Sequence, residues 1–238
     1  MQTTQIGALT VGVLAPRLSH RATLIWTHGL GDSAAGFAPL FSESSLFPSS
    51  SLTDHTRIVL PNAPHIPVTL NMGMVMPAWY DILSLDRTGP LDTAGIARSS
   101  ADLGAVIAAE GELLASQSLD PSDALFVGGF SQGGAISTQT LIDPEIETPT
   151  PAALIAWSAY VLDGSLPGVE GVDVLVNHGT ADEMVTPEWA MPGWEALKDK
   201  WDPESDFQIV EYPGMGHEVS MPQIAAFDSW ISPRLSPL

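Results

Sequence analysis

Short apolar runs alternate with helical patterns along most of this chain, and no other feature limits the possible folds as strongly. The runs that are typical of strands span residues 9–14, 22–27, 57–60, 123–130, 152–158, 172–178 and 206–212. Apolar residues near helical spacing occupy residues 93–118, 133–142, 187–201 and 221–231. The alternation predicts an α/β fold, with a mostly parallel central sheet and helices on both of its faces.

Other features of the sequence predict the first strand, the long loops and the domain organisation of this fold. Residues 9–14 alternate between apolar and other residues, so we expect an exposed leading strand there. Residues 41–54 and 61–81 show little regular pattern and are expected to form long loops. The length of 238 residues, without a linker or an internal repeat, favours a single domain over residues 1–238. Hydrophobic residues make up 45% of the chain and charged residues 15%, so we expect a large core.

The formal net charge of −20 limits the partners of the protein. The chain holds only two lysines, and nucleic acid and anionic membrane surfaces should be repelled. No apolar run approaches the length of a membrane span, and the N-terminal residues do not resemble a signal peptide. We therefore expect a soluble, cytoplasmic protein without a nucleic-acid partner. The absence of cysteine excludes disulfides, thiolate metal sites and a cysteine nucleophile.

The segment FVGGFSQGGA carries the pattern G-x-S-x-G at Gly129, Ser131 and Gly133. It lies between an expected strand and an expected helix, where a serine is forced into a sharp turn above the end of a sheet. The dipole of the following helix favours negative charge at that point. A glycine-rich turn with an incidental serine would have the same letters, but the strand and helix context favours a nucleophile.

A serine nucleophile needs a base, and the base needs an acid that orients it. On this scaffold the expected order along the chain is serine, acid, histidine. Downstream of Ser131 the histidines are His178 and His217. Asp182 follows the end of an expected strand and precedes His217, so the sequence predicts Ser131, Asp182 and His217 as a catalytic triad. His178 as the base and Glu183 as the acid are the alternatives.

The stretch THGLGDSAAG, residues 27–36, allows two interpretations. Its glycines and Ala34 match a dinucleotide-binding fingerprint. Such a loop requires an acidic residue at the end of the next strand, and the sequence LPNAP found there has none. Asp32 within the stretch would also repel a pyrophosphate. We therefore interpret the stretch as part of an oxyanion hole, formed by the backbone amides of Leu30 and Gln132.

Together these motifs resemble the phospholipase/carboxylesterase family of α/β-hydrolases, which includes acyl-protein thioesterases and bacterial carboxylesterases. The resemblance runs through HGLGD, LPNAP, PVTLNMGMVMPAWYD, GFSQGG, HGTADEMV and GMGHEV in that order. It implies an α/β-hydrolase fold, the triad and oxyanion amides named above, and no metal or organic cofactor. Many family members are homodimers, so the resemblance is compatible with a homodimer. Thr27 departs from the family, in which an apolar residue is usual at this place.

These observations predict a serine carboxylesterase that hydrolyses short- to medium-chain carboxylic esters, its small-molecule substrates, through an acyl-enzyme. A thioesterase or lysophospholipase is the alternative within this class, and a catalytically silent binding protein is the alternative outside it. If residues 71–76 are extended, Met72, Met74 and Met76 point to one face and would line the acyl pocket, which Trp79 would close. Otherwise the same residues would pack the loop onto the core.

Overall fold

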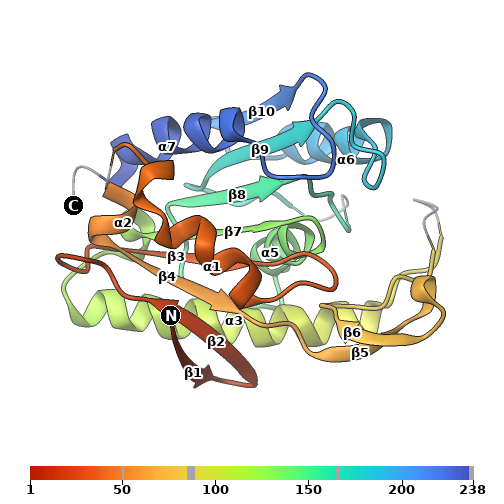
Figure 1. Cartoon of the computed structure of the whole chain (residues 1–238), viewed down its shortest axis with the longest axis horizontal. Helices are drawn as coiled ribbons and strands as arrows, with labels where there is room; N and C mark the ends of the chain where they lie inside the picture. Colours follow the sequence, from red (N-terminus) through yellow and green to blue (C-terminus); the bar gives the residue numbers. More distant parts are fainter. Residues whose placement is uncertain (50, 85–88, 164–166, 236–238) are drawn as a thin grey trace.

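An eight-stranded sheet forms the centre of the protein in the computed structural model, which describes residues 1–49, 51–84, 89–163 and 167–235 (Figure 1). The strands lie in the order β1-β2-β4-β3-β7-β8-β9-β10. From β4 onwards neighbouring strands are parallel, whereas the β1–β2 and β2–β4 pairs are antiparallel. Their bounds are Gln2–Ile6, Leu9–Leu14, Thr56–Pro61, Ala22–Thr27, Leu125–Phe130, Ala153–Trp157, Asp173–Gly179 and Phe207–Tyr212 in that order. This topology confirms the predicted mostly parallel sheet.

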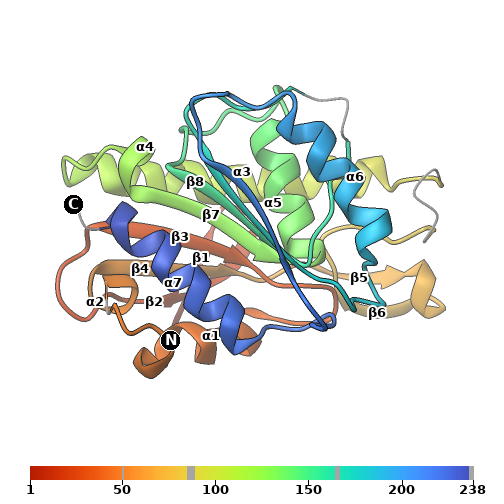
Figure 2. The ribbon, with the colours of Figure 1, turned by 90° about the horizontal axis from the view of Figure 1, so that it is seen from above.

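Helices cover both faces of the sheet (Figure 2). One face carries α1 (Ala34–Ser42), α2 (Ser51–His55) and α7 (Met221–Leu235), and the other carries α3 (Thr93–Ser116), α5 (Gln132–Ile142) and α6 (Pro187–Lys198). The short helix α4 (Pro121–Ala124) directly precedes β7.

Side chains that alternate along a strand join both helical layers to the sheet. On β3, Trp26 lies in the cluster of the first face, where its ring meets Trp157 edge-on at a centroid distance of 4.7 Å. Its neighbour Ile25 belongs to the cluster of the second face. None of the helices in the described ranges has the length and apolar character needed to cross a bilayer.

Residues 9–14 form strand β2, but β2 is neither the leading strand nor exposed. Strand β1 precedes it, pairs with it as a hairpin and occupies the edge of the sheet. Leu9, Val11 and Val13 of β2 are buried. The sequence of β1, QTTQI, is almost wholly polar and gives no apolar period that predicts a strand. The expectation of an exposed leading strand is therefore wrong.

The two stretches expected to be long loops contain regular structure. Residues 41–54 include the end of α1, the 3₁₀ turn η1 (Ser44–Leu46) and most of α2. Residues 61–81 contain β5 (His65–Val68), the turn η2 (Thr69–Asn71) and β6 (Met74–Pro77). Strands β5 and β6 pair as an antiparallel hairpin beside the main sheet (Figure 1). Elements of three to five residues are too short for their periodicity to reveal them, so the expectation of unstructured loops is wrong for these parts.

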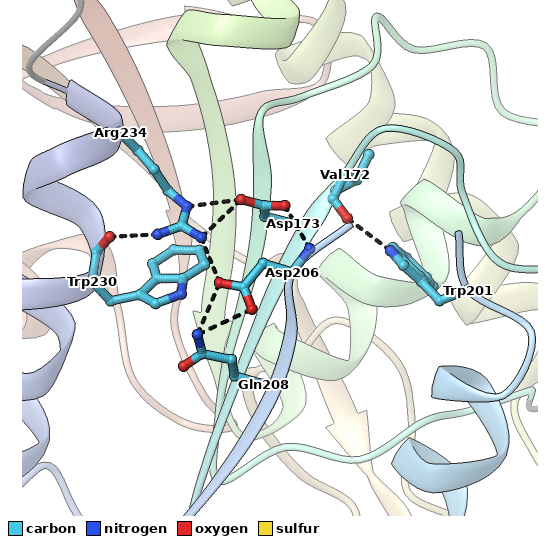
Figure 3. Close-up of polar contacts among 7 residues, drawn as sticks. All are labelled: Val172, Asp173, Trp201, Asp206, Gln208, Trp230 and Arg234. Carbon is cyan, nitrogen blue, oxygen red and sulfur yellow. Dashed lines mark hydrogen bonds and ion pairs between the residues drawn. The ribbon is translucent and has the colours of Figure 1, made fainter. Parts of the chain in front are cut away.

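Arg234, near the end of α7, fastens this helix to the amino ends of β9 and β10 (Figure 3). Its Nε donates to Asp173 Oδ2 over 2.9 Å, and its Nη2 donates to Asp206 Oδ2 over 2.7 Å. Its guanidinium group also lies over the ring of Trp230, 3.7 Å from the ring centroid. This cluster lies at the opposite end of the sheet from the carboxyl ends of the strands, where the candidate site is found.

Candidate active site

Ser131 occupies the turn between β7 and α5 in a conformation that non-glycine residues rarely adopt, with φ 55° and ψ −124°. The two glycines of the motif are required because the backbone around the turn is crowded. A Cβ on Gly129 would lie 2.1 Å from Thr27 Oγ1, and one on Gly133 would lie 2.3 Å from the Thr27 carbonyl oxygen. The amide of Ser131 donates to the carbonyl of Trp157 over 2.8 Å. The motif thus has the predicted strand, turn and helix context.

Three side chains that lie far apart in the sequence form one chain of hydrogen bonds at the carboxyl ends of the strands. His217 Nε2 lies 2.9 Å from Ser131 Oγ, and its Nδ1 lies 2.7 Å from Asp182 Oδ2. The serine follows β7, the aspartate follows β9 and the histidine follows β10. With its two ring nitrogens, His217 therefore bridges the hydroxyl and the carboxylate.

Asp182 is buried, with 2% of its surface exposed, yet its surroundings favour the charged carboxylate. Its Oδ1 accepts hydrogen bonds from the amides of Met184 and Val185, at 2.9 and 2.8 Å. Burial raises the pKa of the Asp182 carboxyl, but the hydrogen bonds from His217, Val185 and Met184 outweigh it and hold this pKa below its ordinary value. A charged carboxylate here orients His217 and stabilises its protonated form.

Neither of the two alternatives takes part in this chain of hydrogen bonds. His178 is fully buried, and its Nε2 donates to the carbonyl of Val185 over 2.7 Å, so it braces the turn that carries Asp182. Its Nδ1 has no hydrogen-bond partner among the described residues, and no bond joins it to the serine. Glu183 is exposed, and the hydrogen bond of His217 is made to its neighbour Asp182. The structure brings together Asp182 and His217 rather than either alternative.

The backbone amides of Leu30 and Gln132 lie beside the nucleophile turn, on the same cavity as Ser131 and His217. Within the described part of the chain, neither amide donates to a protein acceptor. Gln132 is the first residue of α5, where an amide has no partner inside its own helix. Both N–H groups are therefore available to an oxygen atom bound in the cavity.

His28, the first residue of the motif HGLGD, holds the Leu30 loop in shape. Its Nε2 accepts the amide of Ala63 over 3.1 Å, so its Nδ1 carries the proton and donates to the carbonyl of Gly29 over 2.7 Å. Burial lowers the pKa of His28, which keeps the imidazole neutral. His28 is thus a buried part of the scaffold and does not contact the triad residues directly.

Trp79 is also part of this scaffold. It is fully buried, and its indole Nε1 donates to the carbonyl of His28 over 2.8 Å. The side chain of Gln132 accepts the amide of Trp79 at 3.0 Å and donates to the carbonyl of Tyr80 at 2.8 Å. The segment 79–80 is therefore hydrogen-bonded to both halves of the candidate oxyanion hole, to the Leu30 loop through the Trp79 indole and to Gln132 through its side chain.

A cavity of about 630 Å³ opens onto Ser131 and His217. Most of its wall is apolar and comes from segments that follow β6 and β8 and from the region of α6. The apolar residues of the wall are Leu30, Leu70, Ile82, Leu83, Pro90, Leu91, Phe130, Val161, Leu162, Met184, Val185 and Trp189. Such a cavity has the size and character of a site for a small apolar ligand.

The four residues expected to form the substrate pocket do not line this cavity. Met72 is 96% exposed at the turn between η2 and β6, so it does not continue the strand that carries Met74 and Met76. Met74 is exposed on the hairpin, and the sulfur of Met76 accepts a hydrogen bond from Asn71. Trp79 is fully buried and is not part of the cavity wall. The expected extended conformation of 71–76 fails because this segment turns back on itself as a hairpin.

The residues that line the cavity instead follow the carboxyl ends of strands or the hairpin. Tyr160, Val161 and Leu162 come after β8, and Tyr80 to Leu83 come after β6. The position of an apolar segment directly after a strand is the one sequence signal that points to them, since ligands bind at the carboxyl ends of parallel strands.

Comparisons with known proteins found sequence relatives and structural neighbours of this chain. The sequence matches the family model for phospholipase/carboxylesterase over residues 10–233. It is 40% identical over 227 residues to acyl-protein thioesterase 1 of Mycosarcoma maydis, covering 89% of this chain and 91% of that protein. It is 33% identical over 221 residues to acyl-protein thioesterase 1 homolog 1 of Dictyostelium discoideum, covering 91% and 92%. The crystal structure of Arabidopsis thaliana SOBER1 superposes with a TM-score of 0.75 and 29% identity, covering 90% of this chain and 99% of that one.

Proposed function

Because the chain belongs to the phospholipase/carboxylesterase family and has the α/β-hydrolase fold, we propose that it is a serine carboxylesterase of short- to medium-chain esters. The observation that carries the proposal is the chain of hydrogen bonds from Ser131 through His217 to Asp182 at the wall of an apolar cavity. This constellation activates a hydroxyl for attack on a carbonyl carbon.

In the proposed acylation step, Ser131 Oγ attacks the ester carbonyl carbon while His217 Nε2 takes the hydroxyl proton. The carbonyl oxygen becomes an oxyanion, and the amides of Leu30 and Gln132 donate hydrogen bonds to it. Asp182 stabilises the imidazolium that forms. When the C–O bond to the leaving group breaks, His217 gives its proton to the leaving oxygen, and the acyl group remains on Ser131.

Deacylation repeats these steps with water in place of the serine. His217 takes a proton from the water as its oxygen attacks the acyl carbon, and the same two amides hold the new oxyanion. The bond to Ser131 Oγ then breaks, His217 returns the proton to this oxygen, and the carboxylic acid leaves.

A thioesterase is the second candidate, and the names of the two sequence relatives above favour it. The same triad serves both reactions, because the leaving atom is the only part that changes. Rates of hydrolysis of one acyl chain presented as an oxoester and as a thioester separate the two candidates. A lysophospholipase would be recognised in the same way with a lysophospholipid that carries this acyl chain.

Replacement of the nucleophile tests the whole proposal. Ser131→Ala should reduce turnover of a nitrophenyl ester by about a millionfold, as in other serine hydrolases. Ser116→Ala, at the end of helix α3, provides a matched control, because this exposed serine donates to the carbonyl of Leu113 and lies outside the cavity wall. Activity of Ser131→Ala near that of the wild type would refute the assignment. A wild-type protein without activity on oxoesters, thioesters and lysophospholipids would instead favour a catalytically silent binding protein.

A further inference from the structure

Two tyrosines that lie 80 residues apart in the sequence share a hydrogen bond in the wall of the cavity. Tyr80 Oη lies 2.7 Å from Tyr160 Oη. Tyr80 follows the hairpin, Tyr160 follows β8, and both line the cavity that contains Ser131. The hydroxyl pair therefore joins two wall segments at the candidate active site.

Neighbouring groups hold the backbone of Tyr80 and the ring of Tyr160. The carbonyl of Tyr80 accepts the side chain of Gln132, the residue next to the nucleophile. The ring of Tyr160 packs against the ring of Trp189 with a centroid distance of 4.3 Å. These contacts, together with the bond between the two hydroxyls, connect the pair to the nucleophile turn.

The two hydroxyls carry two O–H donors, and the hydrogen bond between them uses only one of these donors. Burial raises the pKa of Tyr80 well above its ordinary value and that of Tyr160 to about 12, so both hydroxyls stay protonated across the working pH range. In a pair of hydroxyls, one O–H donates to the other oxygen, and the second O–H needs a further acceptor. Among the described residues, neither hydroxyl has a hydrogen bond other than the one they share.

Apolar residues continue both wall segments beyond the tyrosines. The wall segments that continue from the two tyrosines are Ile82 and Leu83 on one side and Val161 and Leu162 on the other. A ligand oxygen placed beside this partly buried pair would accept the second O–H, which has no other acceptor among the described residues. The acyl group of a substrate is the part that an apolar wall of this kind accommodates.

We propose that the Tyr80–Tyr160 pair selects acyl groups that carry a hydrogen-bond-accepting oxygen along the chain, such as an ether, keto or hydroxyl oxygen. This inference rests on the proposed esterase function. It assigns the pair a role in specificity, because the tyrosines take no part in the transfer of protons to and from Ser131.

Matched substrates test the proposal. Nitrophenyl octanoate is compared with analogues in which one methylene at a time is replaced by an ether oxygen, and kcat/KM is measured for each. The ratio of the oxa to the all-carbon substrate is then compared between wild type and the double variant Tyr80→Phe/Tyr160→Phe. This comparison cancels the intrinsic reactivity of each ester. At one position of the oxygen, the ratio should be about three- to tenfold higher in the wild type, as expected for one neutral hydrogen bond.

The single variants sharpen this test. Each leaves one hydroxyl whose proton is free but no longer oriented by its partner, so an intermediate ratio is expected. Tyr212→Phe is the matched control, because its buried hydroxyl lacks a partner in the described structure and lies outside the cavity wall. Melting temperatures of all variants report on folding.

The outcomes separate the inference from the function on which it depends. The inference is overturned if the oxa to all-carbon ratio of kcat/KM is the same in the wild type and the double variant at every oxygen position. The double variant would then have lost activity equally on both kinds of ester. A wild-type protein that hydrolyses none of the esters overturns the proposed function instead.

Discussion

The indole of Trp79 donates a 2.8 Å hydrogen bond to the carbonyl oxygen of His28 and so joins the segment after the β5–β6 hairpin to the loop that carries Leu30. Trp79 is fully buried, and Gln132 accepts its backbone amide from the other side. One tryptophan thus connects the two backbone segments whose amides face the candidate oxyanion site. The precision of that site depends on residues that never touch a substrate.

Replacement of this tryptophan should affect both stability and catalysis. Trp79→Phe leaves the His28 carbonyl without its buried donor, at a cost of about 1–3 kcal/mol in the free energy of unfolding. Trp201→Phe is the matched control, because the indole of Trp201 donates to the carbonyl of Val172 over 2.7 Å at the far end of the sheet (Figure 3). Both variants should lose similar stability in urea unfolding, but only Trp79→Phe should lower kcat. Equal kcat values for the two variants would contradict a role for Trp79 in the oxyanion loop.

Thr27 departs from the apolar residue that is usual in the family, and its hydroxyl has a structural explanation. Thr27 Oγ1 lies 2.8 Å from both the carbonyl oxygen of Gly133 and the hydroxyl of Ser137, and so links β3 to the nucleophile turn. Thr27→Val should reduce the free energy of unfolding by about 1–2 kcal/mol. Thr140→Val, which removes a bond made only within α5, serves as the comparison and should cost less. A smaller loss for Thr27→Val than for Thr140→Val would argue against this link.

The lowered pKa of Asp182 makes stability depend on acid pH. The Asp182 carboxyl has a lower pKa in the folded than in the unfolded protein, so the unfolded chain binds more protons at acid pH. The free energy of unfolding therefore decreases as the pH is lowered. The contribution is complete above the ordinary pKa of 3.8 and is lost as the pH falls through the folded value. Urea unfolding of wild type and Asp182→Asn should therefore differ most near neutral pH and converge in acid. A difference that stays constant from neutral to acid pH would contradict this assignment.

The charge around the cavity predicts which leaving groups are favoured. Asp32, Asp81 and Glu183 line it, and no lysine or arginine does so among the described residues. Butyrylcholine should be hydrolysed with a higher kcat/KM than its neutral carbon analogue, 3,3-dimethylbutyl butyrate, by about three- to tenfold at low salt. Added salt and the variant Glu183→Gln should both reduce this preference, since screening and loss of charge act alike. Equal rates for both esters at low salt would show that the carboxylates do not act on the leaving group.

Much of the fold follows from local pattern, since the apolar runs of the central strands are long enough to stand out. The order of Ser131, Asp182 and His217 could be predicted because each follows the carboxyl end of a strand, and these ends meet at one edge of the sheet. Strand β1 could not, because its polar sequence becomes a strand only by pairing with β2.

The cavity wall could not be predicted for a related reason. Methionines look suited to an acyl pocket, but Met72 lies at a turn whose geometry depends on the pairing of β5 with β6. The hydrogen bond between Tyr80 and Tyr160 joins segments 80 residues apart, and no local period of the sequence reports such a contact. Tertiary packing, rather than residue type, decides which side chains reach the cavity.

Covalent labelling tests the central claim most directly, because it asks which hydroxyl the folded protein activates. The protein is treated with a fluorophosphonate, digested, and its peptides are analysed by mass spectrometry. We expect the phosphonyl adduct on Ser131, slow labelling in His217→Ala and no labelling in Ser131→Ala. An adduct on another residue, or an unlabelled protein that still hydrolyses esters, would contradict the account.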